Sequence, residues 1–140
     1  MPSFKVFDIA GSGLSAQSVR LNTVASNLAN ADSVSGDPNA VYKARHPVFE
    51  AVKASLNSQG QSGANAAVRV RGIMESTATP MARYEPGNPL ANSEGYVYSP
   101  NVNTVEEMTD MISASRAYQN NIEVMNTSKE LMLATLKLGQ

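Results

Sequence analysis

The 140-residue chain has no cysteine and a single histidine, His46. The missing thiols exclude disulfides, cysteine nucleophiles and cysteine metal sites, and one imidazole excludes a histidine metal cluster or catalytic histidine pair within the chain. A formal charge of −1 gives no general attraction to phosphate backbones, so we expect no nucleic-acid partner. No apolar run approaches the roughly 20 residues that span a bilayer, so we expect no membrane insertion.

The N-terminal residues do not form the continuous apolar region of a signal peptide, because Asp8 follows Phe4 and Lys5 closely. We therefore expect a soluble chain, or one exported by a route that needs no cleaved signal.

The remaining polar residues form no catalytic pattern. Adjacent Glu106 and Glu107 point about 100° apart on a helix and are interpreted as dipole and capping residues. The run Gly11-Ser12-Gly13 lacks the lysine and the preceding strand of a phosphate-binding loop. Four basic residues suggest a solvated or protein-contacting face, namely Lys43, Arg45, Arg69 and Arg71. The sequence thus predicts no enzyme, no cofactor and no metal.

The N-terminal segment has helical spacing over residues 9–31, with Ser3 and Asp8 as candidate caps. Phe7, Leu14, Leu21 and Leu28 recur every seven residues. Within 9–31 the only charged residue is Arg20, and small neutral residues fill most other positions, whereas a solvated helix face normally carries Glu and Lys. The pattern fits either one amphipathic helix on its own domain or a helix buried on several faces in an oligomer.

The C-terminal segment predicts a long helix from Thr104 to about Leu136, opened by a capping box of Thr104 and Glu107 and ended at Gly139. Two adjacent columns of a heptad frame carry most of its apolar residues. One column is Met108, Ser115, Ile122, Lys129 and Leu136; the other is Met111, Tyr118, Met125 and Met132. Ser115, Lys129 and the adaptable methionines weaken this seam, which favours packing against several neighbours over one strong dimer.

The middle of the chain is rich in Gly, Pro and Ser. Residues 68–73 alternate as a strand, residues 42–46 alternate until Pro47, residues 58–67 have little capacity to fold alone, and residues 95–98 suggest a further short strand. We expect a mainly α protein with a small β insert, divided into an N-terminal helix (1–35), a β/loop region (36–100) and a C-terminal helix (101–140).

Residues 21–32 read Leu-Asn-Thr-Val-Ala-Ser-Asn-Leu-Ala-Asn-Ala-Asp, and residues 114–121 read Ala-Ser-Arg-Ala-Tyr-Gln-Asn-Asn. These stretches resemble the two halves of the signature of bacterial flagellar rod and hook proteins. In that family an Ala-Asn-Asn-Leu-Ala-Asn-like stretch ends a heptad-bearing helix, and Ser26 replaces its first Asn. Residues 84–89, 95–97 and 136–140 extend the resemblance over nearly the whole chain, and its length is similar to that of proximal rod members.

The resemblance implies a subunit of the periplasmic rod in the flagellar basal body, which transmits torque from the rotor ring towards the hook. It implies export by the flagellar type III apparatus and contacts with itself, other rod proteins and the junction of the MS ring and export gate. It also implies a coiled-coil-like pair of terminal helices (D0-type) in an inner tube of a homo- and hetero-oligomeric helical assembly. The implied assembly interface is Leu14, Leu21, Asn27, Leu28, Asn30, Met108, Met111, Arg116, Tyr118, Ile122, Met125 and Met132. Arg116 is a candidate for an intersubunit ion pair.

Two other classes fit parts of the pattern. A needle or inner-rod subunit of another type III apparatus shares the helices, but such chains are usually shorter and lack the β-like insert. A coiled-coil interaction module, nucleic-acid binding or regulatory, shares the heptads, but the near-neutral charge argues against nucleic acid. For the rod subunit we also predict that residues 1–35 and 101–140 are partly unfolded in the free chain and become ordered on assembly.

Overall fold

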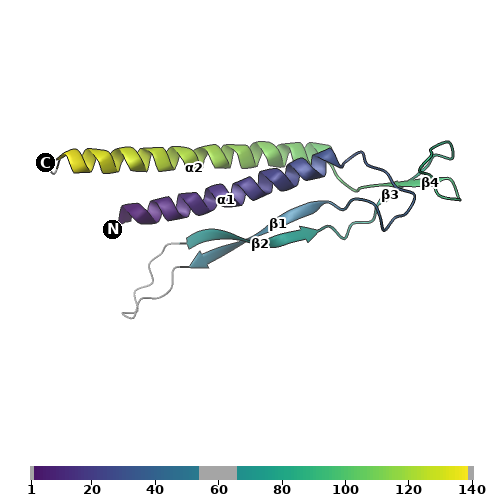
Figure 1. Cartoon of the computed structure of the whole chain (residues 1–140), viewed down its shortest axis with the longest axis horizontal. Helices are drawn as coiled ribbons and strands as arrows, with labels where there is room; N and C mark the ends of the chain where they lie inside the picture. Colours follow the sequence, from purple (N-terminus) through teal and green to yellow (C-terminus); the bar gives the residue numbers. More distant parts are fainter. Residues whose placement is uncertain (1, 54–65, 139–140) are drawn as a thin grey trace.

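The computed structural model describes residues 2–53 and 66–138. Two long helices, α1 (Pro2–Ala29) and α2 (Thr104–Leu138), run antiparallel side by side (Figure 1). The hairpin of β1 (Arg45–Lys53) and β2 (Ala66–Glu75) lies along the other side of α1, and β3 (Met81–Tyr84) and β4 (Tyr96–Ser99) form a second hairpin beyond the helices. The predicted fold class, mainly α with a small β insert between terminal helices, is confirmed.

Helix α1 begins earlier than the apolar spacing predicts. Ser3 and Asp8, the candidate caps, both lie inside it, and Pro2 occupies the first helical position, where its missing N–H costs nothing. At the other end, the Asn30 amide Nδ2 donates to the Ser26 carbonyl at 2.8 Å. The chain then turns, as the polar residues that follow predict.

Helix α2 is capped by Asn103, so the predicted Thr104–Glu107 capping box is wrong. The Asn103 Oδ1 accepts from the backbone N–H of Val105 at 3.1 Å and of Glu106 at 3.4 Å. Asn is among the strongest caps because its short side chain reaches these N–H groups. The Glu107 carboxyl is thereby left for a tertiary contact. The predicted end at Gly139 lies outside the described residues.

The seam between the helices uses one of the two predicted α2 columns. Its α2 side consists of buried or half-buried residues at steps of three and four, namely Glu107, Met111, Ala114, Tyr118, Asn121, Met125, Ser128 and Met132. The Met111 column therefore faces α1. The second column in the seam consists of Glu107, Ala114, Asn121 and Ser128, and it replaces the predicted Met108 column. Ala114 is small and fully buried, Glu107 accepts from Asn27 of α1, and Asn121 lies against Gly13 of α1. The predicted pairing of the two methionine-bearing columns in one seam is wrong.

Helix α1 is covered on two sides within one chain. Val24, Gly13 and Asn27 lie on the α2 side, whereas the Ser12 Oγ accepts from the Val68 N–H of β2 at 3.1 Å. The sparse charge on this helix follows from that double contact. The four heptad residues Phe7, Leu14, Leu21 and Leu28 are all half-buried, one position to the side of the seam.

The first hairpin is antiparallel, pairing Arg45 with Glu75 and Lys53 with Ala66, with a register shift between Val48 and Phe49. The strand predicted over 68–73 lies within β2, whereas β1 runs through Pro47 instead of ending there. Tolerance of Pro47 is understandable because each strand of a two-stranded sheet is an edge. Residues 58–65 of the predicted irregular stretch lie outside the described residues.

The second hairpin confirms the strand expected near residues 95–98, and its partner β3 was not predicted. Val97 is fully buried, and an isolated bridge joins Ser35 to Tyr98, which ties the segment after α1 to β4. Gly95 has a φ of 81°, a left-handed conformation that favours glycine, at the tight turn entering β4. The β region is thus attached directly to the end of α1.

Candidate assembly interface

Asn27 is the polar centre where α1, α2 and the first hairpin meet. It is fully buried, and its Nδ2 donates to the Arg45 carbonyl and to the Glu107 Oε1, both at 2.9 Å. Its Oδ1 accepts from the Tyr42 hydroxyl at 2.8 Å and from the Arg45 N–H at 2.9 Å. Both donors and both acceptor sites of the amide are used, so Asn27 fixes the relative positions of the three elements.

Glu107 is the acidic partner of this centre and is only 6% exposed. Its Oε1 accepts from Asn27, while its Oε2 has no hydrogen-bond partner within the described part of the chain. Burial raises the pKa of Glu107; the Asn27 hydrogen bond and His46 act in the opposite direction, and the nearby charges of Asp110 and Glu106 raise it further. Ionisation of this carboxyl is therefore less favourable in the folded chain than in water.

Two further contacts fix the helix pair. Arg20, the lone charge of the central part of α1, donates to Asp110 at 2.8 Å. A Cβ placed on Gly13 would lie 2.9 Å from the Asn121 Nδ2, so the missing side chain lets α2 approach closely. The charge of Arg20 is thus used within the chain.

The residues predicted for the assembly interface fall into two groups. Most are half-buried or buried within the single chain: Leu14, Leu21, Asn27, Leu28, Asn30, Met111, Tyr118, Met125 and Met132. Met108, Arg116 and Ile122 are exposed, and no ion pair involves Arg116 among the residues that the structure describes. The structure therefore does not bring the whole set together in one place.

Met108 and Ile122 of this exposed group belong to a longer set of exposed apolar residues on α2. Its six side chains are 39% to 71% exposed and are spaced 3, 4, 10, 11 and 3 residues apart along the helix. We call this set the α2 ridge: Val105, Met108, Ile112, Ile122, Leu133 and Leu136. Sequence reasoning missed Val105, Ile112 and Leu133, although a second heptad stripe offset from the first is visible in the sequence.

On the other side of α1 lies an open groove of about 290 Å³ between this helix and the first hairpin. We call it the α1–hairpin groove; its lining is Val19, Asn22, Thr23, Ser26, Arg45 and Ile73. Thr23 is buried, whereas Ile73 of β2 is 52% exposed. The groove is therefore an apolar and small-residue surface that the chain itself leaves uncovered.

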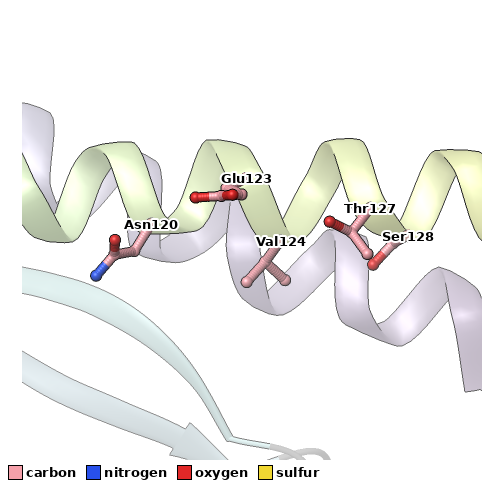
Figure 2. Close-up of a pocket in the computed structure, with 5 residues that line it drawn as sticks. All are labelled: Asn120, Glu123, Val124, Thr127 and Ser128. Atoms are coloured by element: carbon pink, nitrogen blue, oxygen red, sulfur yellow. The ribbon is translucent and has the colours of Figure 1, made fainter.

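A second depression, of about 390 Å³, lies on the flank of α2 away from the ridge. Figure 2 shows its five lining side chains, all from α2: Asn120, Glu123, Val124, Thr127 and Ser128. Glu123 is their only titratable group, which gives no acid–base pair. Within residues 2–53 and 66–138 no group of three or more His, Cys, Asp or Glu is placed to hold a metal ion, and no described helix is long and apolar enough to cross a membrane.

Comparison with known proteins gives matches at both ends and over the whole chain. Residues 7–36 match the family described as flagella basal body rod protein, and residues 93–138 match the family described as flagellar basal body rod FlgEFG protein C-terminal. The chain is 54% identical to the flagellar basal-body rod protein FlgC of Salmonella typhimurium over the full length of both. It is 51% identical to FlgC of Escherichia coli O6:H1, again over both full lengths. It is 41% identical to FlgC of Aquifex aeolicus over 98% of this chain and 97% of that protein.

Proposed function

This chain belongs to the FlgC family of flagellar basal-body rod proteins, and from that membership we propose that it is a structural subunit of the proximal rod. It assembles through its terminal helices with itself and with other rod proteins. The rod it builds transmits torque from the rotor ring to the hook. The observation that carries the proposal is the exposed α2 ridge, a set of large apolar side chains that the described residues 2–53 and 66–138 leave uncovered.

A ridge of this kind is costly to leave in water. Each large aliphatic side chain contributes about 1.5–3 kcal/mol when fully buried. The ridge also has the heptad geometry that a neighbouring helix recognises. Met108 and Ile122 are therefore the predicted interface residues that we propose meet a neighbouring subunit directly. Leu14, Leu21, Met111, Tyr118, Met125 and Met132 act by shaping the helix pair that presents the ridge.

The setting of this subunit is the periplasmic part of the basal body, where its partners include the junction of the MS ring and the export gate. The proposed route is the flagellar type III apparatus. Export through a narrow channel requires the chain to unfold. A helix pair held by one seam and one buried polar centre unfolds more easily than a protein with a large core, so this fold suits that route. We also propose that the helix pair of the free subunit is marginally stable, so that the terminal helices are partly unfolded at equilibrium, and that assembly orders them fully.

Stiffness is the mechanical requirement of a torque-bearing shaft. Asn27 of α1 bonds to both α2 and the first hairpin, which limits sliding of one element past another. Packing of further helices on the ridge extends the same close contact between subunits. In this proposal the internal contacts of α1 make each subunit stiff, and the exposed α2 ridge binds neighbouring subunits.

The test is complementation of motility in a strain that lacks its own proximal rod subunit of this family. We expect the wild-type chain to restore swimming and to appear in purified basal bodies. The ridge variant Ile112→Asp with Ile122→Asp should abolish both, because charge on the ridge prevents burial. Ser113→Asp places one such carboxylate on an exposed neighbouring position outside the ridge, and cells that carry it should swim normally. Full motility of the ridge variant, or a wild-type chain absent from basal bodies, would refute the proposal.

A further inference from the structure

The face that α2 turns towards α1 is not its most apolar one. In the observed orientation, the column beside the Met111 column is Glu107, Ala114, Asn121 and Ser128. A rotated orientation would replace it with the column one residue later, namely Met108, Ser115, Ile122, Lys129 and Leu136. Successive residues are about 100° apart on a helix, so the middle of the seam would move by about half of that angle. Rotation would bury three large apolar side chains that are now exposed.

We infer that two polar contacts, Asn27 with Glu107 and Arg20 with Asp110, set the rotation of α2 about its axis and thereby keep the α2 ridge on the outside. These four side chains are positioning residues for assembly. The inference rests on the proposed function and deepens it, because it identifies what holds the ridge where a neighbouring subunit can reach it.

The geometry of the two contacts fits this role. Asn27 is fully buried, and its Nδ2 donates to the Glu107 Oε1 at 2.9 Å. The Arg20 guanidinium donates to the Asp110 Oδ1 at 2.8 Å. Glu107 and Asp110 both lie on the flank of the Met111 column that is opposite to the ridge, so rotation would turn both carboxylates away from α1. The buried Asn27 amide would then lose an acceptor, which is unfavourable for a buried donor.

Apolar burial favours the rotated orientation and therefore does not explain the observed one. Met108 is 57% exposed and Ile122 is 39% exposed, whereas Ala114 in the observed seam offers little apolar area. A buried polar residue can select one helix arrangement over others at a cost in stability, as a single buried Asn does in coiled coils. The competing cause is close packing, because the fully buried Ala114 lets the two helices approach each other.

The absence of cysteine lets two introduced thiol pairs report the rotation. The seam pair is Gly13→Cys with Asn121→Cys, because a Cβ on Gly13 lies 3.2 Å from the Asn121 Cγ, within reach of a disulfide. The ridge pair is Gly13→Cys with Ile122→Cys and reports the rotated orientation. Each full-length chain is purified, diluted and equilibrated in a glutathione redox buffer. The measured quantity is the ratio of the seam-pair to the ridge-pair disulfide equilibrium constant.

Glu107→Ala with Asp110→Ala removes both contacts from the α2 side. We expect the ratio to fall by about tenfold or more, which corresponds to the usual net contribution of a hydrogen bond to a charged group. The matched control, Glu106→Ala with Glu123→Ala, removes two carboxylates from exposed positions of the same helix and should keep the original ratio. Glu107→Gln with Asp110→Asn keeps both acceptors and should restore most of it.

Two outcomes would overturn the inference. An unchanged ratio in a folded Glu107→Ala, Asp110→Ala chain would mean that packing of Ala114 sets the rotation. An equal fall in the control would mean that the net charge of α2 is the cause. If circular dichroism shows that the test variant does not fold, the comparison is repeated with Ser115→Leu and Lys129→Leu in every chain, which strengthens the rotated seam. The proposed function survives either outcome, because it fails only if the chain is absent from the rod.

Discussion

Helices α1 and α2 have similar heptad patterns in the sequence but different surroundings in the structure. Helix α1 contacts α2 on one side and the first hairpin on the other, and its Arg20 and Asn27 side chains bond to residues of α2. Helix α2 contacts only α1 among the described elements and leaves the ridge uncovered. The same heptad spacing thus lies in internal packing on both sides of α1, whereas in α2 part of it stays exposed.

The largest effect on stability is expected at Asn27, through which α1 bonds to both of its neighbouring elements. Asn27→Ala leaves Tyr42, Arg45 and Glu107 without their shared partner, and each unsatisfied buried group costs about 1–3 kcal/mol. We expect the free energy of unfolding to fall by about 3 kcal/mol or more in urea titrations. The control is Asn30→Ala, which removes one local bond to Ser26 and should cost about 1 kcal/mol or less. Equal losses would mean that Asn27 does not act as the centre of the fold.

A smaller effect on stability is expected at two glycines of α1, Gly11 and Gly13, which have different surroundings. Nothing lies within 4 Å of a Cβ placed on Gly11, so Gly11→Ala should stabilise by about 0.5–1 kcal/mol through helix propensity. The same change at Gly13 meets Asn121 at 2.9 Å, so the clash offsets or outweighs the gain. Thermal unfolding of both variants tests this difference. A Gly13→Ala protein as stable as Gly11→Ala would show that α2 does not approach α1 closely there.

The smallest effect is expected in the pH dependence of the free energy of unfolding, to which Glu107 in the seam contributes. Because burial raises the pKa of Glu107 from its usual 4.5, the folded chain holds this proton more tightly than the unfolded chain does. The free energy of unfolding should therefore fall as the pH rises from about 4.5 through the raised pKa, and the penalty should be absent at lower pH. Glu107→Gln keeps an oxygen for Asn27 and removes the titration, so its stability should change less over this range.

The control for that measurement is Glu106→Gln, one residue earlier on an exposed position of α2. It should retain most of the wild-type slope, since burial, the largest cause of the raised pKa of Glu107, is unchanged and only the smaller contribution of Glu106 is lost. If the unfolding free energy of Glu107→Gln changed with pH as steeply as that of the wild type, a group other than Glu107 would cause the dependence.

The two helices and the small β insert could be predicted from the sequence because their signals are local. Heptad spacing predicted the Met111 column of the seam, and the alternating pattern of residues 68–73 predicted part of β2. The choice of the Ala114 column over the Met108 column was not predictable in this way. It depends on Asn27, Glu107 and Gly13, which meet residues of the other helix far along the chain.

The cap of α2 shows the same limit. Thr104 with Glu107 fits the local capping pattern, but the Glu107 carboxyl bonds to a residue 80 positions away. A buried tertiary partner therefore competes with the local motif, and Asn103 takes the capping role. The ridge was only half predicted because its residues were read together with those of the internal seam.

The unequal length of the helices has a consequence for how such subunits join. Alignment of Gly13 with Asn121 leaves 11 residues of α1 before Pro2 is reached but 17 residues of α2 up to Leu138, so α2 overhangs its partner by about 9 Å at 1.5 Å per residue. Leu136 lies in this overhang. In the rod that we propose, subunits joined at such projecting ends would overlap along the helix axis, so no single transverse plane would separate all of their contacts.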